Sequence, residues 1–388
     1  MGDATRCVHA GEERHGRAAP LTTQIAQTSV FTLPSLGELR KYAAGKSDAF
    51  LYTRYANPTT AVAEAKIAAL EEAEACLVTG SGMAAIHSTI LATCRAGDEI
   101  VCMLDVYGGT TALLENVLPG LGIKNTLVPF HKLGRLESFF TARTRLLFLE
   151  SPTNPTLRCA DLAGLASQAR AHGIVVVVDN TFATPILQKP LALGADLSLH
   201  SATKYLGGHS DLTAGAVAGS ADLVGKARQM MVRTGGSLDP GAAYLLIRGL
   251  KTLELRVERG CKTAAAIVRR LQGHPKLARV MYPGLPAHEG FAAASRQMKD
   301  FGMVVSLELK GGEQAAEKFI DGLKLWYLAT SLGGVESTVS YPMLSSHLNL
   351  SAQRMRWMDV TPGTVRLSVG MENAEDLLRD LEQALAKA

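Results

Sequence analysis

A chain of 388 residues is long enough for two or three domains with a sizeable hydrophobic core. Hydrophobic residues make up 47% and charged residues 20%, as in soluble globular proteins, and the net charge of +4 is dispersed, so no nucleic-acid partner is expected. The six cysteines lack disulfide or zinc spacing, and no apolar run approaches the roughly 20 residues of a membrane span, so we expect a cytoplasmic protein without a metal site or membrane contact.

Residues 1–50 alternate short apolar pieces with Pro20, Pro34 and Gly37. This pattern predicts an extended arm with one short helix over residues 36–44. Such an arm has too little core to fold alone, so we expect it to pack on another part of the molecule or on a second subunit. After the Asn57-Pro58 turn, a helix is predicted to continue to about residue 72, capped by Thr59 or Thr60.

A predicted strand over residues 75–78 leads into Thr79-Gly80-Ser81-Gly82-Met83, which opens a helix that ends near residue 94. Strand, glycine turn and helix together form a phosphate-binding geometry, because the first amides of a helix are free and its dipole is positive there. A glycine turn of this kind is also often purely structural. It is not a Walker loop, because no Gly-Lys-Ser/Thr follows.

Further strands are predicted over residues 99–104, 124–128, 145–149, 174–178 and 197–199, with a helix from residue 162 to about Gly173. This alternation favours a mainly parallel α/β sheet. From about residue 240 we predict a long amphipathic helix over 240–272, strands over 303–309 and 365–369, and a last helix capped by Asn373. The predicted division is an arm over 1–50, a large α/β domain over 51–240 and a smaller α+β domain over 241–388.

Two charged residues stand at the ends of successive predicted strands. Asp179 ends one apolar run, and Lys204 follows the next among hydroxyls and glycines. Ligand sites of open α/β sheets lie at strand ends, where an amine can form a Schiff base and an acid can hold a protonated ring nitrogen. The alternative is a solvated lysine, which these surroundings disfavour.

Two other residues become candidates for the same site only because they occur in one chain with Asp179 and Lys204. Tyr107 follows a predicted strand and could stack on a flat ring, although packing alone explains a single tyrosine there. Arg366 lies inside an apolar strand, where its guanidinium suits a carboxylate ligand or an internal ion pair.

The sequence resembles the Cys/Met-metabolism family of pyridoxal-phosphate (PLP) enzymes, which includes cystathionine γ-synthase, cystathionine γ-lyase, methionine γ-lyase and the O-acylhomoserine sulfhydrylases. The matching motifs are Tyr52-x-Arg54-x-x-Asn57-Pro58, Ser81-Gly82-Met83-Ala84, Glu150-x-Pro152-x-Asn154-Pro155, Asp179-Asn180-Thr181, Ser201-x-Thr203-Lys204-Tyr205, Ser331-Leu332-Gly333-Gly334 and Arg366-Leu367-Ser368. The resemblance implies the fold-type-I architecture of PLP-dependent transferases and a homotetramer built from catalytic dimers.

The resemblance also implies roles for single residues. Lys204 would be the Schiff-base lysine and proton shuttle, Asp179 would pair with the pyridine nitrogen, and Tyr107 would stack on the ring and act as acid and base at the leaving group. The residues expected to hold the phosphate are Gly82, Met83, Ser201 and Thr203, with Tyr52 and Arg54 from the neighbouring subunit. The residues expected to orient the substrate carboxylate and the cofactor O3′ are Asn154, Ser331 and Arg366.

Three positions bear on the substrate. Cystathionine-handling members carry charged residues where this chain has Leu51, Ala112 and Thr330, so an uncharged γ-substituent is favoured. Gly109 stands where methionine γ-lyases carry cysteine, so that likeness is incomplete. We expect a γ-lyase acting on a sulfur amino acid. The alternatives are γ-replacement on an O-acylhomoserine and a catalytically idle homologue, and the intact Lys204 argues against the latter.

Overall fold

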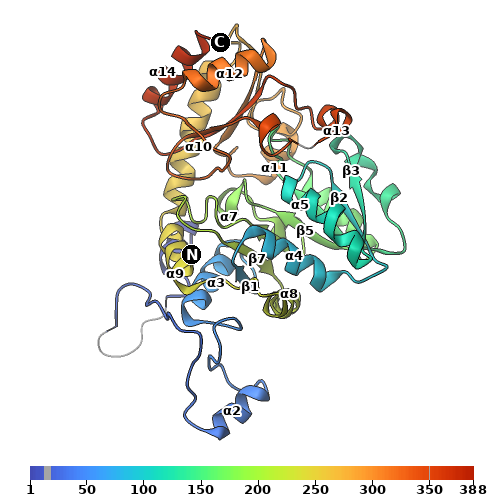
Figure 1. Ribbon diagram of the computed structural model, residues 1–388, viewed down its shortest axis with the longest axis vertical. Helices are drawn as coiled ribbons and strands as arrows, with labels where there is room; N and C mark the ends of the chain where they lie inside the picture. Colours follow the sequence, from blue (N-terminus) through green and yellow to red (C-terminus); the bar gives the residue numbers. More distant parts are fainter. Residues whose placement is uncertain (13–18, 349) are drawn as a thin grey trace.

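The computed structural model describes residues 1–12, 19–348 and 350–388, and part of the predicted arm, residues 13–18, lies outside the described residues. Two sheets organise the chain (Figure 1). The strands of the larger sheet are β1 (Ala75–Thr79), β2 (Glu99–Met103), β3 (Lys124–Val128), β4 (Thr144–Glu150), β5 (Val175–Asp179), β6 (Leu197–His200) and β7 (Gly215–Gly219). The strands of the smaller sheet are β8 (Leu277–Met281), β9 (Val304–Leu309), β10 (Tyr327–Leu328), β11 (Thr338–Ser340) and β12 (Thr364–Ser368).

The larger sheet has the order β1-β7-β6-β5-β4-β2-β3. All of its neighbouring strands are parallel except for β7, which runs antiparallel to both β1 and β6. The prediction of a mainly parallel central sheet is therefore confirmed. The predicted strands from residue 75 to residue 199 agree with β1 to β6 to within about one residue at each end, whereas β7 was not predicted separately.

Helices cover both faces of this sheet, because its strands are apolar on both sides. The helices are α1 (Asp3–His9), α2 (Leu36–Ala43), α3 (Pro58–Glu71), α4 (Gly82–Thr93), α5 (Gly108–Ala112), α6 (Leu162–Ala171), α7 (Thr184–Leu187), α8 (Ala221–Thr234), α9 (Pro240–Leu250), α10 (Leu253–Leu271), α11 (Phe291–Gln297), α12 (Gly312–Gly322), α13 (Ala352–Trp357) and α14 (Ala374–Leu385). One core contains side chains of α4, α6 and α8, and the other contains side chains of α3, α9 and α10. Leu77 faces the first core and Val78 the second, as the period of a strand requires.

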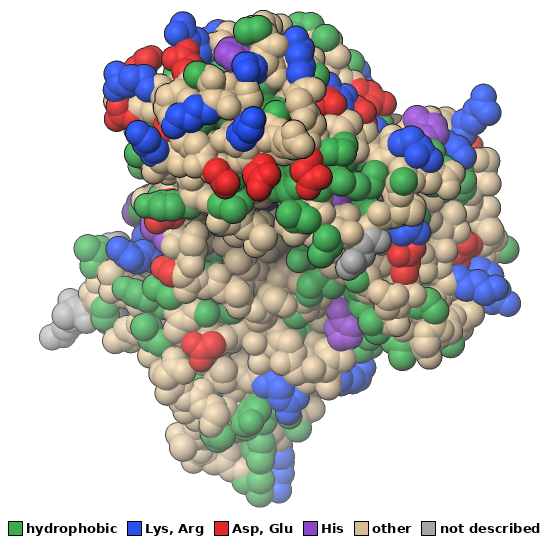
Figure 2. All heavy atoms as spheres, turned by 45° about the horizontal axis from the view of Figure 1, so that its top comes forward, with side chains coloured by type: hydrophobic (Ala, Val, Ile, Leu, Met, Phe, Trp, Pro, Cys, Tyr) green, Lys and Arg blue, Asp and Glu red, His purple; other side chains and the backbone are tan. Residues whose placement is uncertain are grey.

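The smaller sheet has the order β10-β11-β12-β9-β8, and it packs with α10, α12 and α14 around a third core. In Figure 1 this C-terminal part is orange to red and lies at the top, above the larger sheet. The predicted boundaries near residues 50 and 240 stay predictions. On the face drawn in Figure 2, basic and acidic side chains are interspersed rather than gathered in one basic patch. Among the residues that the structure describes, no helix is both long and apolar enough to cross a bilayer.

The prediction of one helix over 240–272 is wrong, because the chain forms α9 and α10 with a break at Thr252. Close to the break, Gly249 packs tightly on another segment, since an added Cβ there would lie 2.1 Å from the carbonyl oxygen of Gly207. The Gly249 carbonyl accepts a hydrogen bond from the Thr252 amide at 3.2 Å and another from Nη2 of Arg256 at 2.7 Å.

Two N-terminal predictions also need correction. The arm holds a second helix, α1, which the sequence analysis missed and whose Cys7 is buried against the body. The cap of α3 is Asn57, whose Oδ1 accepts the amide of Thr59 at 2.9 Å, rather than Thr59 or Thr60. Both threonines are buried in the first turn. The predicted short helix over 36–44 is confirmed as α2, which Figure 1 shows at the end of a segment that extends away from the body.

Candidate active site

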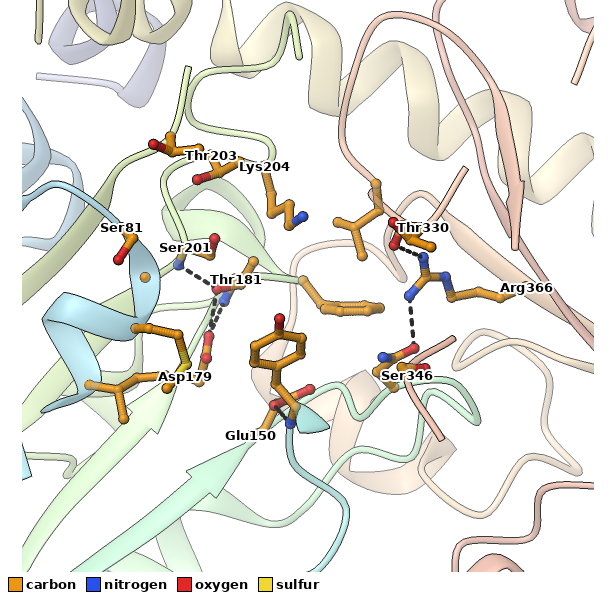
Figure 3. A pocket seen from close by; sticks show the side chains of 18 residues that line it. Ser81, Glu150, Asp179, Thr181, Ser201, Thr203, Lys204, Thr330, Ser346 and Arg366 are labelled. Atoms are coloured by element: carbon orange, nitrogen blue, oxygen red, sulfur yellow. Dashed lines mark hydrogen bonds between the residues drawn. The ribbon is translucent and has the colours of Figure 1, made fainter. Parts of the chain in front are cut away.

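A cavity of about 250 Å³ lies where the strands of the larger sheet end and the C-terminal part of the chain closes over them (Figure 3). It is lined by Ser81, Gly82, Met83, Ile86, Tyr107, Glu150, Asn154, Asp179, Thr181, Phe182, Ser201, Thr203, Lys204, Thr213, Thr330, Leu332, Ser346 and Arg366. Strands β4, β5 and β6 are parallel, so the residues that follow them meet at one edge of the sheet.

Lys204 follows β6, and its side chain points into the cavity (Figure 3). Its Nζ donates a hydrogen bond to Oγ of Ser331 at 2.8 Å. Burial lowers the pKa of Lys204, and the positive charge of Arg366 lowers it further. Both effects favour the neutral amine, which is the form that attacks an aldehyde or takes up a proton.

Asp179 ends β5, and Thr181 fixes its carboxylate. Oδ1 of Asp179 accepts the Thr181 amide at 3.0 Å and the Thr181 hydroxyl at 2.5 Å. The same hydroxyl accepts the amide of Ser201 at 2.8 Å. Burial raises the pKa of Asp179, and the Thr181 hydrogen bonds and the nearby His200 oppose that rise. No described residue donates to Oδ2, so this oxygen can accept from a ligand N–H.

The N-terminus of α4 supplies free amides. Oγ and the carbonyl oxygen of Ser81 accept the amides of Ala84 and Ala85, both at 3.1 Å, which leaves the first two amides of the helix, Gly82 and Met83, open toward the cavity. A Cβ at Gly82 would lie 2.9 Å from Cβ of Ser201, so only glycine keeps this space clear. Free amides, a helix dipole and a clear space form an anion cradle.

Thr203 lines the cavity, but its hydroxyl is already engaged. It donates to the carbonyl oxygen of Ala214 at 3.2 Å and accepts the Ala214 amide at 3.0 Å. Ser201 shows no such bond from its hydroxyl among the described residues. The phosphate role predicted for Thr203 therefore has less support from the geometry than the one predicted for Ser201.

Arg366 comes from β12 and is held by acceptors around it. Nη1 donates to Oδ1 of Asn154 at 2.9 Å, and Nη2 donates to the carbonyl oxygens of Ser331 at 2.9 Å and Thr330 at 3.3 Å. Its Nε is buried and has no partner in the described part of the chain. Burial lowers the pKa of Arg366 to about 10, so the guanidinium stays charged at neutral pH. A fixed, charged donor without an acceptor suits a ligand carboxylate.

Tyr107 lines the cavity and is 49% exposed. Its backbone amide donates to Oε2 of Glu150 at 2.7 Å, which fixes the turn before α5. Burial, together with the negative charge of Asp179, raises the pKa of Glu150 well above its usual range. The tyrosine ring is thus accessible to a ligand while its backbone is fixed.

Four predicted site residues lie away from the cavity within one chain. Arg54 donates to the carbonyl oxygen of Val232 at 2.6 Å, and its guanidinium lies 5.5 Å from the centre of the Tyr52 ring. The backbone of Leu51 pairs with Phe31 in the arm, and Ala112 is exposed on α5. Whether a second subunit brings the arm residues to a site stays a prediction.

The sequence analysis missed several residues of the cavity, of which Thr181, Glu150 and Ser346 make polar contacts there. Thr181 and Glu150 stand in the strand-end motifs beside Asp179 and Asn154, so their position was a usable signal. Ser346 follows a Pro-containing segment and carried no signal of its own.

The donors and acceptors of the cavity fit PLP. Lys204 offers an amine with a lowered pKa for the aldehyde, Asp179 offers a free carboxylate oxygen for the ring N–H, and the Gly82 and Met83 amides offer an anion cradle for the phosphate. The charged guanidinium of Arg366, which also lines the cavity, suits the carboxylate of an amino acid. This arrangement can hold a cofactor and a substrate side by side.

Comparison with known proteins also indicates a PLP-dependent enzyme. Residues 4–386 match the family model described as Cys/Met metabolism PLP-dependent enzyme. The chain is 44% identical to L-methionine gamma-lyase of Fusobacterium nucleatum subsp. polymorphum, over 100% of this chain and 98% of that protein. It is also 44% identical to cystathionine gamma-synthase 1, chloroplastic, of Arabidopsis thaliana, over 99% of this chain and 69% of that protein.

Two solved structures are similar over the whole chain. One is metB from Corynebacterium glutamicum, with a TM-score of 0.93 and 38% identity, covering 100% of this chain and 98% of that one. The other is cystathionine gamma-lyase from Lactobacillus plantarum complexed with L-serine, with a TM-score of 0.93 and 37% identity, covering 100% and 99%.

Proposed function

The chain belongs to the Cys/Met-metabolism family of PLP-dependent enzymes, and on that premise we propose that it is a γ-lyase acting on a sulfur amino acid with an uncharged γ-substituent. With methionine as substrate, one water is consumed, and the products are methanethiol, α-ketobutyrate and ammonia. The relatives include methionine γ-lyases and cystathionine γ-synthases at similar identity, so the choice rests on the cavity itself.

The observation that supports this choice is the charge inventory of the cavity. Its charged lining residues are Glu150, Asp179, Lys204 and Arg366, and each has a partner or a predicted role toward the cofactor or the substrate carboxylate. Thr330 lines the cavity without charge. A zwitterionic distal arm, as in cystathionine, would bring two further charges with no partner, and an unpaired charge in such a site is costly.

When bound, PLP supplies an electron sink that stabilises negative charge next to the substrate amino group. We assign the other tasks to side chains. Arg366 binds the substrate carboxylate. Lys204, whose pKa is lowered by burial, acts as the base at Cα and, after it has released that proton, at Cβ, which lets the γ-substituent leave. The Tyr107 hydroxyl donates a proton to the departing sulfur. Ser331, the acceptor of the Lys204 amine, sets the angle from which the amine approaches.

The rival function is γ-replacement on an O-acylhomoserine, in which a thiol occupies the γ-position instead of leaving it. All the residues named above serve both reactions. The cystathionine γ-synthases among the relatives keep this alternative open.

One assay separates the two functions. The purified holoenzyme is incubated with methionine, cystathionine or O-acetylhomoserine, each with and without a thiol, and α-ketobutyrate is measured. We expect ketoacid from methionine whether or not thiol is present, and none from a Lys204→Ala control. Ketoacid only from O-acetylhomoserine, suppressed by thiol, would overturn the lyase in favour of replacement.

We also propose that the arm completes the site of a second copy in a homotetramer. Tyr52 and Arg54 lie outside their own cavity, and Leu21, Ile25 and Val30 in the same arm are exposed. Apolar side chains left in water favour burial against another subunit. Sedimentation analysis tests the assembly, and a monomer that binds the cofactor with full affinity would contradict it.

A further inference from the structure

Ser346 lines the cavity although it comes from the segment between β11 and α13. Figure 3 shows it on the same side of the cavity as Arg366. Its backbone packs tightly on the turn after Tyr107, because a Cβ at Gly108 would lie 2.8 Å from the carbonyl oxygen of Ser346. The Ser346 backbone is thus fixed beside Tyr107, and its side chain lines the same cavity as Arg366.

A buried histidine fixes this hydroxyl. Nδ1 of His347 lies 2.7 Å from Oγ of Ser346, and the imidazole is only 3% exposed. Its backbone amide donates to the carbonyl oxygen of Pro342 at 2.9 Å, which holds the segment in place. Burial and the charge of Arg366 lower the pKa of His347 to about 4, so the ring is neutral at neutral pH.

Two buried nitrogens on this side have no partner among the described residues, namely Nε of Arg366 and Nε2 of His347. Arg366 Nε always carries a hydrogen, and no described residue accepts it. A carboxylate has two oxygens and about four lone pairs, more than a single Nε–H can satisfy. A hydroxyl that lines the same cavity as Arg366 would supply a further donor.

We propose that Ser346 is a second donor to the substrate carboxylate, next to Arg366, and that His347 is the positioning residue that directs the Ser346 hydroxyl proton into the cavity. For this, Nδ1 of His347 must carry the ring hydrogen and donate it to Oγ of Ser346. The hydroxyl proton is then free to point at a ligand oxygen, and Nε2 keeps only a lone pair. The inference rests on the proposed function only in that the substrate is an amino acid, and it holds for elimination and replacement alike.

The test uses ligands that lack the amino group and therefore cannot react with the cofactor. Methylthiobutyrate keeps the carboxylate of methionine, and methylthiobutanol replaces it with a hydroxyl. Binding of each to the holoenzyme is measured by titration calorimetry. We expect Ser346→Ala to weaken methylthiobutyrate about tenfold, the effect of one hydrogen bond to a charged group, and to leave methylthiobutanol unchanged.

A matched pair of variants tests the histidine. His347→Asn places an amide N–H where Nδ1 lies and should keep most of the affinity. His347→Gln moves that group away from Ser346 and should lose about as much as Ser346→Ala. The double variant Ser346→Ala, His347→Gln should bind no more weakly than Ser346→Ala alone, because the histidine acts through the hydroxyl.

Several results would overturn the proposal: unchanged affinity of Ser346→Ala for methylthiobutyrate, equal weakening of both ligands, or equal behaviour of the Asn and Gln variants. A changed preference among γ-substituents with unchanged carboxylate affinity would place the hydroxyl at the distal end and would also overturn it. The cofactor absorbance and melting temperature of each variant show that the site is intact. None of these results depends on whether methionine yields α-ketobutyrate, so the proposal and the lyase function can fail separately.

Discussion

Replacement of Thr181 by valine should weaken cofactor binding through Asp179. Valine has nearly the shape of threonine but lacks the hydroxyl that donates to Oδ1 of Asp179 at 2.5 Å. Loss of a hydrogen bond to a charged group costs about 1.5–3 kcal/mol, which corresponds to about a ten- to hundredfold loss of affinity if the charged carboxylate is the form that binds.

The direction in which the PLP affinity of Thr181→Val changes with pH follows from the same Thr181–Asp179 hydrogen bond. Burial raises the pKa of Asp179, and the Thr181 hydroxyl opposes that rise because it stabilises the carboxylate. Without the hydroxyl the pKa rises further, so more of the acid is protonated near neutral pH and cannot accept from the ring N–H. The affinity lost by Thr181→Val should therefore return as the pH is raised into the alkaline range.

The assay is a titration of apoenzyme with PLP, followed by absorbance at several pH values, for wild type, Thr181→Val and Thr181→Ser. The serine variant keeps the hydroxyl and should behave as wild type. The valine variant also leaves the Ser201 amide without its acceptor, so its melting temperature should fall at every pH. If Thr181→Val folds but shows wild-type affinity and the wild-type pH profile, Thr181 does not hold Asp179 in its charged form.

Three further predictions concern the anion cradle, the carboxylate site and the distal pocket. Gly82→Ala places a methyl group 2.9 Å from Cβ of Ser201. Apoenzyme titration should therefore show at least about tenfold weaker binding of PLP and unchanged binding of pyridoxal, which lacks the phosphate. An equal loss of affinity for both ligands would contradict the anion cradle. Arg366→Lys keeps a charge but loses the planar fork, so KM for amino-acid substrates should rise about ten- to hundredfold in steady-state kinetics with the cofactor absorbance unchanged, and an unchanged KM would refute the assignment. Ala112→Arg with Thr330→Glu should raise kcat/KM for cystathionine over methionine about tenfold, measured as α-ketobutyrate, whereas no change would mean that the distal pocket lies elsewhere.

Much of the larger sheet could be predicted from the sequence because its signals are local. Apolar runs that end on Asp179 or lead to Lys204 define both the strand and its functional end, and parallel strands bring those ends together. The antiparallel strand β7 was harder to predict, since Gly215–Gly219 consists of small residues apart from one β-branched residue, Val217. The close approach of Gly249, near the end of α9, to the distant backbone of Gly207 is likewise a contact that no local pattern reveals.

In the candidate site, too, some residues can be identified from their neighbours in sequence, whereas others are brought in only by the packing of distant segments. Thr181 could have been identified, because it stands two residues after Asp179 and threonine can donate to a neighbouring carboxylate. Ser346 could not, because its place in the cavity depends on how the C-terminal segment packs on Gly108. Ala112 illustrates the opposite case: its motif position suggested a role at the substrate, yet within one chain it is exposed and is not among the residues that line the cavity.

The geometry also explains how cofactor chemistry and substrate choice can vary independently. Asp179 and Arg366 are buried, Lys204 is half-buried, and each is fixed by a specific neighbour, so a change at any of them should disturb the proposed chemistry. Thr330 is different, because it is exposed at the rim and contributes to that network only its backbone carbonyl, which accepts from Arg366. A new side chain at Thr330 keeps that carbonyl in place. It can therefore add a charge for a distal substrate arm without a loss in the carboxylate site, and this physical independence is the reason that specificity should be sought at the rim rather than at the strand ends.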